Sequence, residues 1–81
     1  MEKQRIILRI FNEEYQIRTD VEELQLQSLA RVVDEKMANI AKQQSALTPS
    51  KIAVLAALEL ASELDELKKA YGELLAIAKE N

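Results

Sequence analysis

The strongest constraint on this chain is segment 49–80, which contains no proline after its first residue, Pro49, and a single glycine, Gly72. A helix over this segment would be on the order of 45 Å long at 1.5 Å per residue. Thr48 can cap its start, and Pro49 suits the first helical position because its missing N–H would have no partner there. Gly72 weakens the last turns by about 1 kcal/mol without ending the helix. Because 81 residues are too few to cover this helix, we expect much of it to project.

Apolar residues recur along this helix with the spacing of a coiled coil. The intervals alternate between three and four residues for about three heptads, as the a and d positions of a coiled coil do. Asp65 and Lys69 lie four residues apart, in the order that favours an ion pair on a water-facing helix surface. The pattern predicts that the helix pairs with other helices through Ala57, Leu60, Leu64, Leu67, Tyr71, Leu74 and Ala78.

The start of the same helix, residues 52–61, is apolar on all sides. Such a helix is typically buried all round, so we expect it to contact the rest of the chain and a second copy. Its small alanines would permit close helix approach. The predicted oligomer interface therefore comprises Ile52, Leu55, Leu58, Leu60, Leu64, Leu67, Tyr71 and Leu74.

The composition favours the same conclusion. A single domain of 81 residues has a marginal core when it folds alone. The chain has no cysteine, which excludes disulfides and thiolate metal sites, and it has no histidine. Of the usual means of stabilising so small a chain, oligomerisation remains.

The N-terminal part predicts a β-hairpin. Residues 6–11 are rich in β-branched and aromatic side chains, with Ile6, Leu8 and Ile10 on one face of a strand and Ile7, Arg9 and Phe11 on the other. Residues 12–14 are expected to form the turn, and 15–18 alternate as a returning strand. Because a two-stranded hairpin is barely stable alone, it must lie on a helix or pair with a second copy.

A first helix is expected to follow the hairpin. Thr19 and Glu22 match a capping box, and the helix should run to about Lys42 or Gln44. Its apolar stripe comprises Leu26, Ala30, Val33, Met37 and Ile40, widened by Leu29 and Val32, and its opposite face carries Gln27, Arg31, Asp34 and Glu35.

These elements define the expected fold class. It is α+β, with a hairpin–helix head at residues 1–46 and a long helix with a coiled-coil tail at 47–81. We expect this single unit to be oligomeric.

Catalysis is not expected. The carboxylate pairs at 13–14, 22–23 and 34–35 fall on a turn, a cap and an exposed helix face, where solvation is the simpler reading. No histidine is present to activate a serine, and one glycine cannot make a phosphate-binding loop. We therefore expect no enzyme, no cofactor and no metal site.

The charge distribution and hydropathy exclude other classes of function. The net charge is -3, and acids outnumber bases both before Leu47 (eight to seven) and after it (six to four). Neither part has the basic excess of a nucleic-acid footprint. No apolar run approaches the ~20 residues that span a bilayer, and residues 1–5 do not open a signal peptide. We expect no nucleic-acid partner, no membrane insertion and a cytoplasmic location.

Three segments together resemble the ZapA family, bacterial cell-division proteins that associate with the FtsZ ring. They are residues 10–15, 30–37 and 51–61, the last reading KIAVLAALELA. The resemblance implies an intertwined dimer of heads, a coiled-coil rod and a dimer of dimers. It also implies a protein at the mid-cell division site that crosslinks FtsZ filaments, bundles them and stabilises the division ring.

Two residues depart from the family pattern. Asn12 stands where the family usually has glycine, although Asn can adopt the same backbone conformation. Glu13 stands where a basic residue is common. We expect the FtsZ-binding surface among exposed charges of the head, any of which could equally serve solubility alone: Arg9, Glu13, Arg18, Lys36 and Lys42.

Two other functions fit the same sequence. The first is a generic coiled-coil adapter or regulator that shares this architecture and binds a different protein. The second is a dimer that binds nucleic acid, which the charge distribution disfavours.

Overall fold

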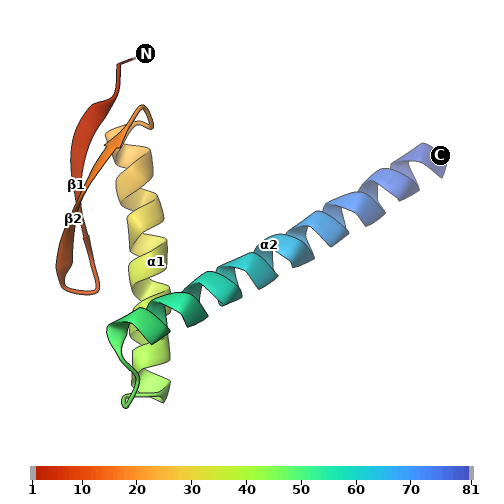
Figure 1. Cartoon of the computed structure of the whole chain (residues 1–81). Helices are drawn as coiled ribbons and strands as arrows, with labels where there is room; N and C mark the ends of the chain where they lie inside the picture. Colours follow the sequence, from red (N-terminus) through yellow and green to blue (C-terminus); the bar gives the residue numbers. More distant parts are fainter. Residues whose placement is uncertain (1, 81) are drawn as a thin grey trace.

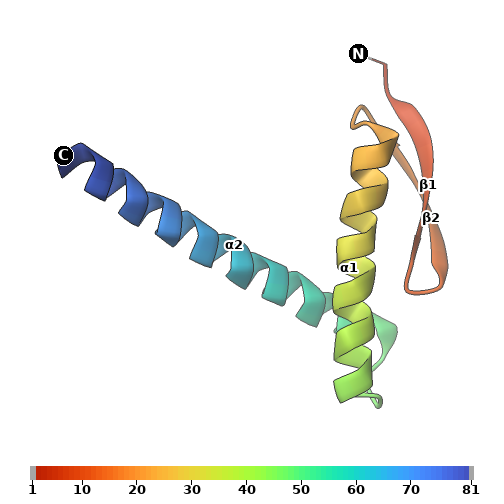
Figure 2. The same ribbon diagram turned by 180° about the vertical axis from the view of Figure 1, so that it is seen from behind.

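The computed structural model of the chain describes residues 2–80, which form a hairpin and two helices. Strands β1 (Gln4–Ile10) and β2 (Glu13–Thr19) pair antiparallel. Helix α1 (Glu23–Gln43) lies along the hairpin, and helix α2 (Pro49–Glu80) crosses the lower part of α1 and extends away from it (Figures 1 and 2). The predicted α+β fold, with a hairpin–helix head and a long C-terminal helix, is confirmed. The outer ends of the two expected parts, Met1 and Asn81, lie outside the described residues.

The hairpin turn consists of two residues, Phe11 and Asn12, with φ of 51° and 65°. Two positive φ values in a two-residue loop are the mark of a turn whose twist matches that of its strands. The prediction of a turn at 12–14 was right for Asn12 and wrong in its bounds, because Phe11 belongs to the turn and Glu13 already pairs with Ile10 as the first residue of β2. A side chain other than glycine is strained at positive φ, least so for Asn. The Phe11 position therefore needs support from elsewhere.

Asp34 of α1 supplies that support. Its Oδ1 accepts a hydrogen bond from the backbone N–H of Phe11 at 2.7 Å, in a partly buried setting. A carboxylate acceptor makes this bond stronger than one between neutral groups. Asp34 was expected on the exposed face of the helix, and the structure corrects that placement.

Replacing Asp34 with Ala is expected to lower the free energy of unfolding by about 1–2 kcal/mol, because the Phe11 N–H loses a charged acceptor. Asp34→Asn keeps an acceptor oxygen and should lose less. Urea denaturation of the three proteins at one concentration measures the difference. Identical midpoints for Asp34→Ala and the wild type would contradict a supporting role for this bond.

The start of α1 differs from the predicted capping box. Thr19 ends β2, paired with Gln4, and its Oγ1 accepts the N–H of Val21 at 3.1 Å. The N-cap is Glu22, without a side-chain cap hydrogen bond, so the helix begins three residues later than expected. The box failed because pairing in the sheet holds Thr19, whose hydroxyl then closes a local turn.

The core consists of two small clusters, one toward each end of α1. In the first, Ile6 and Leu8 of β1 pack on Ala30, with Ile10 and Leu26 beside them. The predicted inward face of β1 is thereby confirmed. Leu29 and Val32, expected to widen the stripe of α1, stay 51% and 44% exposed because the hairpin covers one side of the helix.

The second cluster joins α1 to α2. Met37 and Ile40 of α1 enclose Ile52 and Ala56 of α2, which are 3% and 1% exposed. Ile52 and Ala56 are one turn apart, so the buried side chains through which α2 docks on the head lie within a single turn. We call this contact the junction.

The rest of α2 also follows the sequence closely within the single chain. Thr48 Oγ1 accepts the N–H of Lys51 at 3.4 Å, which confirms the predicted cap. Residues 61–80 are all exposed, so the expected projection is confirmed. Burial of 52–61 on all sides is not seen within the chain, since Val54 and Leu58 are 60% and 61% exposed. One crossing helix cannot cover more than one face of α2.

Candidate self-association and partner-binding surfaces

An apolar stripe runs along the projecting part of α2, which we call the rod (residues 61–80). Its large side chains are between 52% and 67% exposed. Asp65 and Lys69 form the expected ion pair at 3.1 Å, outside the predicted a and d positions. Soluble monomers rarely expose a continuous apolar stripe of this size. We call the stripe the rod seam; it comprises Leu64, Leu67, Tyr71 and Leu74.

Further apolar side chains widen this stripe beyond the heptad positions. Leu75 and Ile77 near the end of the rod are 44% and 58% exposed, and Val54 and Leu58 are exposed near the junction. A narrow apolar stripe at the a and d positions is typical of a helix that pairs with one other helix, whereas a wider stripe is typical of a helix that packs against several. The heptad spacing alone had passed over Leu75 and Ile77, although their hydrophobicity was visible in the sequence.

The predicted interface residues nearer the head divide between two environments. Ile52 is buried at the junction within the chain, and Leu55 is half-buried against it. Leu60 is half-buried further along α2. Leu58 is exposed, as is the rod seam. Packing inside one chain therefore already uses part of the predicted interface.

A concave apolar groove lies between the hairpin, α1 and the first turns of α2. Tyr15 and Ile17 of β2 line it with Val33 and Met37 of α1 and Ala53 of α2. The Tyr15 hydroxyl donates to Glu13 Oε2 at 3.2 Å, and this hydrogen bond raises the pKa of Tyr15 above 10.0. Among residues 2–80, no group of three or more His, Cys, Asp or Glu side chains could hold a metal ion. The groove is suited to packing and offers no evident reactive group.

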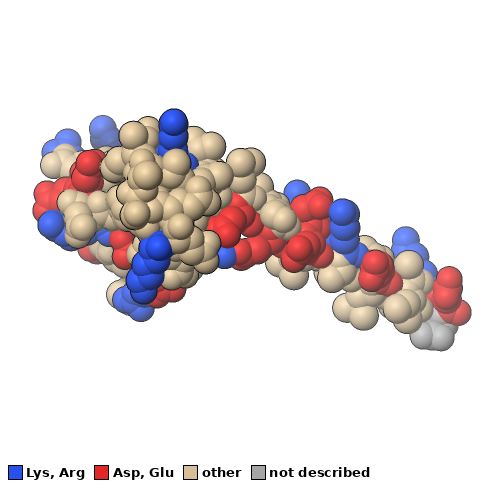
Figure 3. Space-filling view, turned by 90° about the horizontal axis from the view of Figure 1, so that it is seen from below, with Lys and Arg blue, Asp and Glu red and all other residues tan. Residues whose placement is uncertain are grey.

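Lys36 holds the rod to the head. Its ammonium donates to the carboxylate of Glu63 on α2 and forms an ion pair with it. This hydrogen bond is the main reason that the pKa of Lys36 lies above 10.5; the charges of Glu63 and Glu59 also raise it, and burial opposes them. Figure 3 shows acidic side chains gathered where the rod leaves the head. Lys36 was predicted as a partner-binding residue, yet its charge is engaged within the chain.

The Lys36–Glu63 pair has a defined pH dependence. Because the pKa of Lys36 is raised in the folded state, the pair stabilises fully below the unfolded value of 10.5 and is lost as pH rises through the folded value. We expect Lys36→Gln to be less stable than the wild type by a constant amount between about pH 6 and pH 9, and this difference to disappear as pH rises through the raised folded-state pKa of Lys36. Thermal denaturation across this range measures it.

Charge exchange provides the control for this pair. Lys36→Glu alone should be less stable than the wild type, and adding Glu63→Lys should restore much of the loss. Failure of the exchange to restore stability would show that the two side chains act independently.

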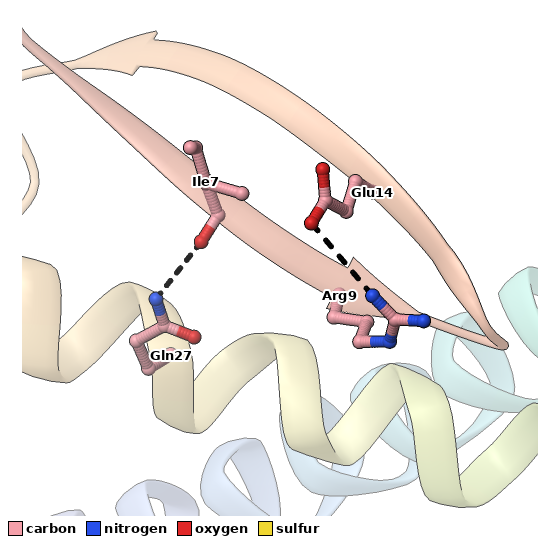
Figure 4. A network of polar contacts seen from close by, with 4 residues as sticks. All are labelled: Ile7, Arg9, Glu14 and Gln27. Atoms are coloured by element: carbon pink, nitrogen blue, oxygen red, sulfur yellow. Dashed lines mark hydrogen bonds and ion pairs between the residues drawn. The ribbon is translucent and has the colours of Figure 1, made fainter.

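The other predicted partner-binding residues do not share one surface. Arg9 lies on the hairpin face turned away from the core, with its Nη1 3.7 Å from Glu14 Oε1 (Figure 4). Arg18 lies on the same face, because strand alternation and register place it opposite Arg5. Glu13 is on the reverse face, bonded to Tyr15. Lys42 is exposed in the last turn of α1.

Arg5 was missed by the sequence reasoning. It precedes the segment predicted as a strand, which began at Ile6, whereas β1 begins at Gln4. The available signal was its spacing of two residues from Ile7 and four from Arg9, which places all three on one strand face.

A hairpin–helix head that carries a projecting helix with an exposed apolar stripe defines a class of small self-associating structural protein. The model of a family described as cell division protein ZapA matches residues 6–80. The cell division protein ZapA of Oceanobacillus iheyensis is 36% identical over 78 residues, covering 96% of this chain and 91% of that protein. That of Geobacillus kaustophilus is 33% identical over 72 residues, covering 89% and 79%. This chain belongs to the ZapA family of cell division proteins.

Solved structures agree with this assignment. A ZapA mutant dimer from Geobacillus stearothermophilus superimposes with a TM-score of 0.76 at 33% identity, covering 98% of this chain and 92% of that one. A conserved bacterial protein of unknown function from Pseudomonas aeruginosa gives a TM-score of 0.77 at 28% identity, covering 94% and 85%. The family is one of cell division proteins, and none of these names denotes an enzyme. Neither α1 nor α2, the helices within residues 2–80, combines the length and the hydropathy that a membrane span requires.

Proposed function

We propose that this protein binds FtsZ filaments in the cytoplasm at mid-cell, crosslinks and bundles them, and thereby stabilises the division ring. It acts by binding alone, without catalysis, cofactor or nucleic acid. The observation that carries the proposal is the exposed rod seam on a chain of the ZapA family.

Crosslinking requires two binding surfaces on one particle. A head alone can occupy one filament, whereas two heads joined through paired rods can occupy two. The second binding event then proceeds at the effective concentration set by the rod, which raises the overall affinity without new contacts. A stiff helix suits this purpose because it holds the two heads apart.

The proposed assembly is a homodimer that associates further into a dimer of dimers. Leu55, Leu58 and Leu60 near the junction would contact the partner copy, and the rod seam would continue that contact outward. The additional exposure of Leu75 and Ile77 supports packing against more than one helix. The head at 1–46 and the helix at 47–81 would then have separate roles in filament binding and assembly.

Sedimentation of purified FtsZ with GTP, with and without this protein, tests the proposal. The wild-type chain should pellet with the filaments and produce bundles visible by electron microscopy. A variant that cannot pair its rods should still bind filaments weakly but should not bundle them. Absence of both co-pelleting and bundling at low and moderate salt would rule out the proposed function.

A further inference from the structure

The face of the hairpin turned away from α1 is basic, in a chain whose net charge is -3. Ile6 and Leu8 point into the core, so their strand neighbours point outward. The register then places Arg5 opposite Arg18, Ile7 opposite Gln16 and Arg9 opposite Glu14. We call these six residues the outer face.

Arg5 and Arg18 are directly opposed like charges. The Ile7 carbonyl accepts a hydrogen bond from Gln27 Nε2 at 3.1 Å, so it points away from β2 (Figure 4). Ile7 and Gln16 are therefore a pair without mutual backbone hydrogen bonds. Such pairs alternate with hydrogen-bonded pairs along an antiparallel ladder, so Arg5 and Arg18, two residues further along, are also a non-hydrogen-bonded pair. Their Cα atoms are then only about 4.5 Å apart. Like charges in this position destabilise a sheet.

Within the described residues, no ion pair offsets this repulsion. Their ion pairs involve Arg9, Lys36 and Lys69, and neither Arg5 nor Arg18 takes part in one. Glu2 and Lys3 line a hollow with Arg18 at this end of the hairpin, and their own charges are opposite in sign. A two-stranded hairpin has little stability to lose. A binding role for Arg5 and Arg18 would explain why the hairpin keeps two opposed arginines that lower its stability.

We propose that the outer face docks an extended acidic segment of the filament protein, in which two carboxylates flank an apolar residue at two-residue spacing. The inference rests on the proposed function and assigns the chemistry of its partner. Arg5, Ile7 and Arg9 repeat at about 6.8 Å along β1, which is the repeat of side chains on one face of an extended partner. Guanidinium groups bind carboxylates through two parallel hydrogen bonds, and Ile7, 54% exposed, offers the apolar contact.

The surroundings favour an acidic protein segment over DNA or a lipid surface. Glu14 lies within the face and pairs with Arg9. The rod leaves the head through an acidic region (Figure 3), and every added copy contributes a further net charge of -3. An extended polyanion such as DNA would be repelled by the acidic residues around the outer face, whereas a short acidic segment would contact the basic outer face alone.

Arg5→Glu separates binding from stability. It converts the like-charge pair with Arg18 into an opposite-charge pair, so the melting temperature should rise by about 2–5 °C at fixed protein concentration. The affinity for FtsZ filaments should nevertheless fall about tenfold, and the remaining affinity should depend less on salt concentration. A residue with a purely structural role would move both quantities in the same direction.

Arg31→Glu is the matched control, because it makes the same charge change at an exposed position of α1. Co-pelleting that is reduced for Arg5→Glu and unchanged for Arg31→Glu supports the proposal. Equal pelleting of Arg5→Glu and wild type would overturn it and leave the proposed function intact. A wild-type protein that does not pellet with FtsZ filaments would contradict both this inference and the proposed function. Tighter, Arg5-dependent binding to a short DNA duplex or to phosphatidylserine vesicles would reject a protein segment as the ligand.

Discussion

Leu67→Asp is expected to break the oligomer and so to lower the mass of this protein in solution, toward the 9.2 kDa of one chain. Leu67 is 67% exposed in the single chain and lies in the middle of the rod seam. When two rods pair, the substitution places a carboxylate on each of them in an apolar contact. Burying an unpaired charge costs several kcal/mol, more than a short coiled coil can lose. Leu64→Asp should act in the same way.

Light scattering coupled to size-exclusion chromatography measures this effect directly. Ala76→Asp is the matched control, because it adds the same charge to the same rod, two heptad positions after Leu74 and so away from the predicted a and d positions. It should leave the mass unchanged. An unchanged mass for Leu67→Asp would refute the assignment of the rod seam as the pairing surface.

Ile52→Ala is expected to lower the free energy of unfolding by about 2–4 kcal/mol. Ile52 is 3% exposed in the cluster that joins the two helices, so its truncation leaves a cavity beside Met37 and Ile40. A chain of this size has only a few kcal/mol to lose. We therefore expect α2 to detach from the head, with a large fall in the denaturation midpoint.

The control for this truncation is Leu24→Ala in the first turn of α1, where the side chain is 86% exposed. It removes a similar volume and should change stability by no more than about 0.5 kcal/mol. Both variants need the same protein concentration, because oligomers gain apparent stability as concentration rises. Equal midpoints for Ile52→Ala and the wild type would show that the junction does not hold the helix.

Periodicity predicted the elements of this fold well, since it reports on burial along a single element. Ile6 and Leu8 on one strand face, and Ala30, Met37 and Ile40 on one helix face, follow from spacing alone. The family resemblance, drawn from three segments, is also confirmed.

Features that depend on pairing between elements were missed. The positive φ of Phe11 is supported by Asp34, 23 residues away, and no local pattern reveals that bond. Thr19 satisfied the rule for a helix cap, but pairing with Gln4 placed it in a strand.

The charged surface was the least predictable part for the same reason. Lys36 looked like a free charge until the crossing of the helices brought Glu63 to it. The opposition of Arg5 and Arg18 likewise follows from the strand register, which the sequence specified only approximately.

The buried contact between α2 and the head spans one turn, and the Lys36–Glu63 pair on the surface is a second restraint, so α2 can pivot at the junction. About 24 residues of α2 continue beyond Ala56, which corresponds to an arm of roughly 36 Å. A rotation of about 10° at Ala56 would therefore displace the free end by about 6 Å, more than one helical turn of rise. Small changes in packing around Ala56 would be amplified into the separation of the two heads, even though Ala56 itself need touch neither a filament nor a second rod.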